Sequence, residues 1–268
     1  IPPMTIVLAR VGLAAALLYL LRRLRGRRLP AFGPAWGHFA VMGVMTNAVP
    51  FWLFCWGEQY VASALAAILN GSTPLFALLL AHWFVPDDRM TRVKALGAAI
   101  GFAGLAATIA PAMRADGLAG SALGALAIAL AAAFYGAGFV YARLFMRGFP
   151  PLVAPTAQLA IAALILAPIC LAFERPFALP APSWRALGSV IALATIGTAL
   201  ALAIYYWLVE RLPPSSLSMV TYLIPIFGVA IGAAALGERL DWHAAAGCGL
   251  ILLGVAIVNG VFKIVWIR

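Results

Sequence analysis

The sequence predicts an all-α polytopic membrane protein built as an inverted repeat, and three observations carry this prediction. First, the chain of 268 residues is 65% hydrophobic and 10% charged, with a mean hydropathy of +1.04, whereas a soluble domain carries about 25% charged residues. Second, apolar stretches of membrane length recur along the whole chain, where a β-barrel would show short alternating strands. Third, a proline-centred motif occurs in two of these stretches.

Nine membrane spans follow one another along the chain, each an apolar run bounded by polar or basic residues. A helix needs about 20 predominantly apolar residues to cross the hydrocarbon core, and each run is close to that length. We place the spans near residues 4–22, 36–57, 62–85, 92–110, 118–142, 152–173, 185–208, 216–236 and 242–264.

The repeat becomes visible when the last four spans are laid on the first four. Prolines, tryptophans and glycines then recur at matching places. The matched pairs are Pro2-Pro3 with Pro150-Pro151, Trp36 with Trp184, Trp56 with Trp207, Pro74 with Pro225, Gly97 with Gly247 and Gly104 with Gly254. The span at 118–142 has no partner, so we expect two five-helix units, residues 1–111 and 112–268. We further expect ten helices in the native protein, the first being absent from this sequence.

The distribution of basic residues predicts the orientation. If the loop at 22–35 is cytoplasmic, alternation places thirteen of the 18 Lys and Arg residues inside and four outside, with Arg10 within a span. Such a bias indicates the cytoplasmic side, and it puts the C-terminus in the cytoplasm. Because a five-helix unit has an odd number of spans, the second unit enters the membrane inverted, which suits alternating access.

The two proline motifs run from Asn70 to Phe76 and from Thr221 to Phe227. A proline cannot donate to the carbonyl four residues earlier, which here belongs to Asn70 and to Thr221. In hydrocarbon a freed carbonyl must be satisfied by protein or water, so such a break lies inside the bundle or beside a wet cavity. Matching breaks in two halves are typical of a transporter's substrate site, and we expect Pro74 and Pro225 to act as helix breaks and gating points.

The predicted substrate site lies on the two proline helices and on their neighbours at 36–57, 118–142 and 185–208. Polar side chains accompany aromatic ones there, which suits a ligand with a polar amino acid head and an apolar side chain. We predict substrate contacts for Asn47, Trp52, Asn70, Thr73, Tyr135, Thr198, Tyr205, Tyr206, Thr221 and Tyr222. Two alternatives stay open: Asn and Thr can serve only to bond helices together, and Tyr and Trp near span ends can form interfacial belts.

Arg10 is the one charge well inside a span, about six residues into its helix, and Gln158 is its equivalent in the repeat. A buried Arg is a functional hypothesis by default, and this one could hold a substrate carboxylate by charge-assisted bonds. It could equally snorkel to the outer headgroups or pair with a group on the expected helix upstream of Ile1. No acidic residue lies deep in any span, which favours facilitated diffusion or exchange over proton coupling.

Three further motifs lie at the ends of spans. They are Leu236-Gly237-Glu238-Arg239-Leu240 at the end of the second proline helix, Leu212-Pro213-Pro214-Ser215 at its entry, and Phe134-Tyr135 with Tyr141-Ala142-Arg143 closing the fifth span. Together these motifs resemble the EamA domain of the drug/metabolite transporter superfamily. The first half of the repeat differs from the second at the place of the Leu-Gly-Glu-Arg motif, where it has Val85-Pro86-Asp87-Asp88-Arg89. The resemblance implies ten helices, cytoplasmic termini and export of amino acids or other metabolites. Within the superfamily the chain is most similar to YddG-type aromatic amino acid exporters.

We therefore expect a membrane transporter that exports aromatic or other neutral amino acids, or similar small metabolites, by alternating access. A sugar-phosphate or nucleotide-sugar carrier would need several deep cations, and a cationic-drug exporter would need a buried Glu. A membrane-embedded enzyme rests only on a lone HxxxxD match at His82–Asp87, so we expect no enzyme. The Ala, Leu, Arg and Gly bias favours a bacterial inner membrane, with a plastid envelope still open.

The expected partners are an amino acid substrate and the lipid bilayer, with either a monomer or a homodimer possible. The net charge of +10 lies in short loops and indicates topology rather than nucleic-acid binding. Cys55, Cys170 and Cys248 lie in apolar runs without CxxC spacing, as packing residues do. We expect neither a cofactor nor a metal.

Overall fold

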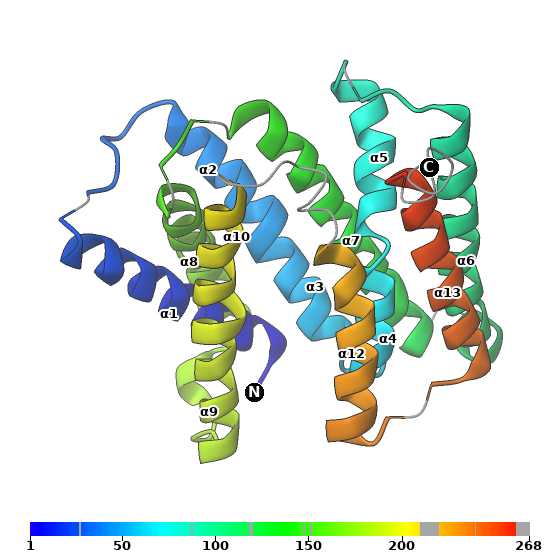
Figure 1. Cartoon of the computed structure of the whole chain (residues 1–268). Helices are drawn as coiled ribbons and strands as arrows, with labels where there is room; N and C mark the ends of the chain where they lie inside the picture. Colours follow the sequence, from blue (N-terminus) through cyan, green and yellow to red (C-terminus); the bar gives the residue numbers. More distant parts are fainter. Residues whose placement is uncertain are drawn as a thin grey trace. The chain divides into compact units, whose positions relative to one another are not determined.

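The computed structural model describes residues 1–26, 28–86, 88–117, 120–146, 148–150, 152–209, 220–238 and 240–260. This part of the chain is helical and contains no strand (Figure 1). Seven helices within it are long and apolar enough to cross a membrane, and two shorter apolar helices cover Leu223–Leu236 and Trp242–Val258. The prediction of an all-α polytopic membrane protein is confirmed.

The helices fall where the nine spans are predicted, with one feature that the pattern did not predict. Two spans contain a short π-helical segment (η1 and η3), where the backbone takes one extra residue per turn. The elements are α1 (Pro3–Leu24), α2 (Ala35–Gly43), η1 (Val44–Ala48), α3 (Val49–Gly57), α4 (Ser63–Asn70), α5 (Thr73–Phe84), α6 (Arg92–Asp116), α7 (Gly120–Phe145), α8 (Val153–Phe173), the 3-10 turn η2 (Pro176–Ala178), α9 (Trp184–Ala194), η3 (Thr195–Leu200), α10 (Ala201–Val209), α12 (Val220–Leu236) and α13 (Trp242–Val258).

The chain forms two compact units. Unit 1 contains the described residues of 1–55 and 141–213, and unit 2 those of 56–140 and 214–268. Within each unit, helices from equivalent places in the repeat pack together: α1 against α8 in unit 1, and α4 against α12 and α6 against α13 in unit 2. Each compact unit therefore takes helices from both halves of the sequence.

The crossing of α6 and α13 in unit 2 is made by the matched glycines. A Cβ atom on Gly97 would lie 2.8 Å from the carbonyl oxygen of Gly254, and one on Gly104 would lie 2.8 Å from that of Gly247. Since Gly97 is equivalent to Gly247 and Gly104 to Gly254, the contact is reciprocal, as a two-fold axis requires. The two helices run antiparallel across it, which is how an inverted repeat brings equivalent helices together.

The first proline motif interrupts its span between α4 and α5. The backbone leaves the helix at Gly71 and Ser72, and α5 restarts at Thr73 with Pro74 in its first turn. The Thr73 hydroxyl donates to the carbonyl of Asn70 at 2.8 Å, and the Ser72 hydroxyl donates to that of Leu69 at 2.6 Å. Side chains of the motif itself thus satisfy the carbonyls that the break releases.

The expectation of a matching break at Pro225 is wrong, because α12 runs through this proline from Val220 to Leu236. Glycine has a much lower helix propensity than Tyr, Leu or Ile, and the second motif has Tyr222-Leu223-Ile224 where the first has Gly71-Ser72-Thr73. A Cβ atom on Gly71 would lie 2.6 Å from Cγ of Pro225. The two proline motifs therefore pack against each other in unit 2.

A glutamate caps the first helix in two of the three packed pairs, α1 with α8 and α4 with α12. The carboxylate of Glu174, which follows α8, accepts from the backbone N–H groups of Met4 and Thr5 at 2.9 and 2.6 Å, and from the Thr5 hydroxyl at 2.8 Å. Glu238, which follows α12, accepts from the first two backbone N–H groups of α4 at 3.0 and 2.8 Å. A negative charge at a helix N-terminus satisfies orphan donors and is favoured by the helix dipole.

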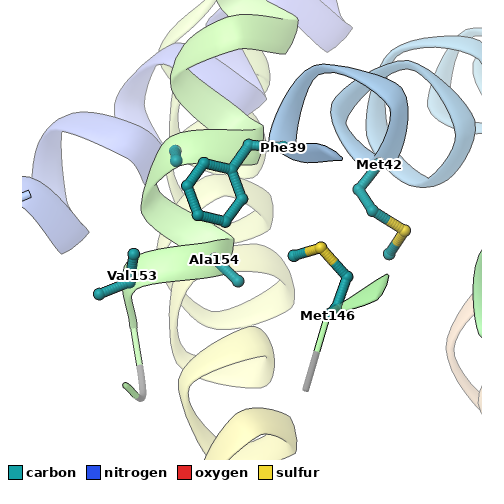
Figure 2. Packing of buried hydrophobic residues seen from close by; sticks show 6 residues of the cluster. Phe39, Met42, Met146, Val153 and Ala154 are labelled. Atoms are coloured by element: carbon teal, nitrogen blue, oxygen red, sulfur yellow. The ribbon is translucent and has the colours of Figure 1, made fainter. Parts of the chain in front are cut away.

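The core of unit 1 contains an apolar cluster between α2, α8 and the end of α7, which holds these elements together. Figure 2 shows the side chains of Phe39 and Met42 gathered with those of Met146, Val153 and Ala154. Tyr206 of α10 packs against the same cluster. The cluster thereby fixes α10 beside α8, where polar side chains also meet.

Candidate substrate-binding site

The two π-helical segments of unit 1 place Asn47 and Thr198 at the same position, the fourth residue of η1 and of η3. Both side chains are buried, with exposed fractions of 2% and 1%. Pro50 follows η1 closely and cannot donate to the carbonyl of Thr46, which accounts for the wider turn there. Single π turns inside α-helices occur frequently at functional sites, so these two positions are candidates.

Arg10 points into unit 1, where it meets both helices that carry a π segment. Its Nε donates to the hydroxyl of Thr198 at 2.7 Å, and its guanidinium carbon lies 3.6 Å from the centroid of the Phe51 ring. Thr198 in turn donates to the carbonyl of Leu193, five residues earlier, at 2.8 Å. The π turn of η3 therefore supplies the acceptor that orients the hydroxyl under Arg10.

Gln158 occupies on α8 the place that Arg10 occupies on α1, and it makes an analogous contact. Its Nε2 donates to the hydroxyl of Tyr206 at 3.1 Å, and the side chain is 2% exposed. A Cβ atom on Gly43 would lie 2.7 Å from the backbone carbonyl oxygen of Gln158, so α2 and α8 approach closely beside this contact. Both polar residues thus bind the helix formed by η3 and α10, from which Thr198 and Tyr206 project.

Other predicted side chains of unit 1 extend this surface. The rings of Tyr205 and Tyr206 are perpendicular, with centroids 5.4 Å apart, and Trp52 on α3 is half-buried. The amide of Asn47 donates to the neighbouring hydroxyl of Thr46 at 3.0 Å. Hydroxyl, amide, guanidinium and aromatic groups are the kinds of group that orient a solute in a binding site. In the part of the chain that the structure describes, no three His, Cys, Asp or Glu side chains are placed to hold a metal ion.

The remaining predicted residues belong to unit 2. The hydroxyl of Thr73 also lies 3.2 Å from Oδ1 of Asn70, so both side chains contribute to the break between α4 and α5. Tyr135 is half-buried on α7. Thr221 and Tyr222 lie in the first turn of α12, and their side chains lie outside the described residues. The predicted site residues thus divide between the two units.

Two residues of the unit 1 site, Phe51 and Gln158, were missing from the predicted set. Phe51 lies one turn after Asn47, and Gln158 is the repeat equivalent of Arg10. The sequence therefore contained an indication for each residue. The indication for Gln158 was the stronger, because its equivalent is an Arg within a span and a buried Gln also needs hydrogen-bond partners.

In unit 2, helices from equivalent places in the repeat pack antiparallel. In unit 1, polar side chains lie on membrane-length helices that contain π turns. Together these two features define a membrane transporter of the inverted-repeat class. Comparison with known proteins agrees with this class: the model of the EamA-like transporter family matches residues 1–110 and 122–260. The chain belongs to the EamA-like transporter family.

Two of its relatives are similar over nearly all of this chain and over about four fifths of their own length. YedA, an uncharacterized inner membrane transporter of Escherichia coli strain K12, is 27% identical over 96% of this chain and 82% of its own. A probable terminal-alkyne amino-acid exporter of Streptantibioticus cattleyicolor is 28% identical over 95% of this chain and 81% of its own. A solved crystal structure with 21% identity superposes with a TM-score of 0.68, covering 96% of this chain and 88% of the other; this likeness shows the fold alone.

Proposed function

We propose that the protein exports aromatic or other neutral amino acids, or similar small metabolites, by alternating access and facilitated diffusion across a bacterial inner membrane. The observation that carries the proposal is the set of contacts in unit 1 that joins Arg10 to Thr198 and Gln158 to Tyr206. These groups combine a cation, hydroxyls and an amide with aromatic rings, as recognition of a zwitterion with an apolar side chain requires.

Membership of a transporter family and one relative named as an amino-acid exporter support the same proposal. Few charged side chains lie within the membrane-length helices, which supports an amino acid or other neutral solute. An exporter of sugar phosphates would need several cations at this depth, whereas the described helices of unit 1 carry only Arg10 away from their ends.

Reconstitution into liposomes tests the proposal. Vesicles holding the full-length protein should release labelled Phe, Tyr, Trp or Leu down a concentration gradient, and an imposed pH gradient should leave the rate unchanged. Empty vesicles provide the baseline. Release of every amino acid at the rate of empty vesicles would overturn the proposal, and release that follows the pH gradient would replace facilitated diffusion by proton coupling.

A further inference from the structure

We propose that an anionic phospholipid binds unit 1 in a crevice at the C-terminal end of α1, with its phosphate on Arg25 and an acyl chain along α10. The proposal does not depend on which solute the protein transports. It begins from the crevice itself, which has a volume of about 250 Å³ and is lined by Arg25, Leu152, Ala203, Ile204 and Trp207. None of the described substrate-binding residues lines it, so the crevice is a separate site.

The crevice lies between the end of α1, the start of α8 and one face of α10. α1 packs against α9 and η3, which precede α10. Three side chains of α10 share the face that lines the crevice, because residues three and four apart are neighbours on a helix; they are Ala203, Ile204 and Trp207. Tyr206 lies on another face, where it packs against the apolar cluster of unit 1. Ile204 and Trp207 are 48% and 50% exposed, so each has apolar surface left for contact with a lipid chain.

The walls of the crevice match the depth profile of a lipid. Trp207 is next to last in the membrane-length helix Trp184–Leu208, and tryptophan at a span end lies at the level of the headgroups. Arg25 directly follows α1, which ends at Leu24. The crevice is smaller than the roughly 300–1,000 Å³ of pockets that enclose a small molecule. Its ligand therefore continues outside it, as a phospholipid lying along a helix does.

Charge complementarity favours an anionic lipid over a zwitterionic one. Five arginines occur within the seven residues 22–28, and a basic cluster directly after a membrane span is typical of binding to anionic headgroups. In the described part of unit 1 the one acidic residue is Glu174, which caps the opposite end of α1, about 30 Å away along the helix. Glu210 and Arg211, which follow α10, lie outside the described residues and cancel in net charge.

Arg22 organises the basic loop. Its side chain is buried, and its Nη2 donates to the backbone carbonyl of Arg28 at 2.6 Å. This bond holds the loop close to the end of α1, while Arg23, Arg25 and Arg28 remain exposed. One arginine thus fixes the loop and three present their charge to headgroups. Of these three, Arg25 is the one that lines the crevice.

A comparison of lipids tests the proposal, with binding measured as thermal stabilisation of the purified full-length protein in detergent micelles. Dioleoyl phosphatidylglycerol should raise the unfolding midpoint at a concentration about fivefold lower than dioleoyl phosphatidylcholine, as expected for one cation at the membrane surface. Glycerol phosphate has the headgroup without the chains and should have no effect. Equal stabilisation by the two lipids, or stabilisation by glycerol phosphate, would overturn the proposal.

Two matched variants locate the site. Arg25→Gln and Arg23→Gln each remove one charge from the same loop, but only the first removes it from the crevice. Arg25→Gln should remove most of the preference for phosphatidylglycerol, whereas Arg23→Gln should change it by less than about twofold, because exposed charges away from the site are screened. Equal losses in the two variants would show diffuse attraction by the whole loop and overturn the site.

A third variant fills the crevice and keeps every charge. Ala203→Phe places a ring where the acyl chain is proposed to lie, so it should also abolish the preference for phosphatidylglycerol. A preference unchanged in this variant would overturn the proposal. Should Ala203→Phe fail to fold, the two arginine variants decide alone.

Discussion

Thr198 makes two bonds at once, and both depend on the π turn that contains it. Its hydroxyl accepts from Arg10 and donates to the carbonyl of Leu193, five residues back. In a regular α-helix a Thr hydroxyl reaches the carbonyl three or four residues back. Thr195 in the same segment does so, donating to the carbonyl of Ile191 at 2.8 Å on an exposed face. The two threonines therefore form a matched pair in one segment.

Thr198→Val removes the hydroxyl and keeps the shape of the side chain. The bond to a charged donor is worth about 1.5–3 kcal/mol, so the apparent affinity for a carboxylate solute should fall roughly tenfold or more. Thr195→Val is the control and should change the affinity by less than about twofold. Affinity is measured from the concentration dependence of flux in liposomes. Equal effects of the two substitutions would show that the Arg10 contact plays no part in binding.

Glu238 shows how a motif residue can be recognised in the sequence while its role stays hidden. It belongs to the Leu-Gly-Glu-Arg motif that indicated the EamA family. Its carboxylate caps α4, whose first residues lie about 175 positions earlier in the chain. A partner so distant leaves no local signal, whereas a normal capping residue lies next to its own helix. The motif therefore identifies the fold and contributes to its packing.

The crossing of α6 and α13 is an element-level feature in which backbones touch directly. Glycines at seven-residue spacing let the helices approach until a Cβ atom on Gly254 would lie 2.5 Å from the backbone nitrogen of Gly101. Such close approach gains van der Waals contact in a membrane, where apolar burial drives little association. Gly249, on the same helix, has no atom within 4 Å of its would-be Cβ.

Gly254→Ala should lower stability, because the new methyl group meets backbone atoms that cannot move aside. The expected cost is about 1–3 kcal/mol, as for other overpacked sites. Gly249→Ala adds the same methyl group to the same helix in open space, and the higher helix propensity of alanine should leave stability equal or raised by up to about 1 kcal/mol. Thermal unfolding in detergent micelles compares the two. A similar midpoint for both variants would contradict the packing seen at this crossing.

The proline motifs show where a repeat in sequence stops being a repeat in structure. Both motifs place a proline in a membrane-length run, but only the first has Gly71, and only there does the helix end and restart. Proline removes one hydrogen bond in either case. Whether the helix breaks or continues depends on the neighbouring residues and on hydroxyls that can satisfy the released carbonyls.

At the level of the whole molecule, the inverted repeat is consistent with the membrane orientation that the basic residues predict. Repeat-equivalent helices pack antiparallel in unit 2, as they do when the second copy is inverted. The charge distribution independently predicts that the loop at 22–35 is cytoplasmic. An inverted repeat can open to either side by exchanging the conformations of its two halves. The predicted loop orientation therefore also bears on the alternating-access mechanism, because that mechanism requires the two halves to be inverted.

Cysteine labelling tests that orientation. After Cys55, Cys170 and Cys248 are replaced by Ala, single cysteines are introduced by Arg28→Cys and Ala178→Cys. A membrane-impermeant maleimide added to intact cells should label the cysteine at 178, and the cysteine at 28 only after the membrane is opened. Labelling of both from outside, or of 28 alone, would reverse or discard the predicted topology.

The amino-acid sequence by itself determined the class, the spans, the family and the pairing of equivalent positions, because these follow from hydropathy, charge bias and residues that recur at fixed spacing. It also identified Asn47, Thr198 and Arg10 as candidate substrate-binding residues. Only the tertiary structure decided that Arg10 meets Thr198, that α12 continues through Pro225, and that Glu238 caps a distant helix. These outcomes depend on contacts between residues far apart in the chain, and their energies are set by which groups the fold brings within hydrogen-bonding distance.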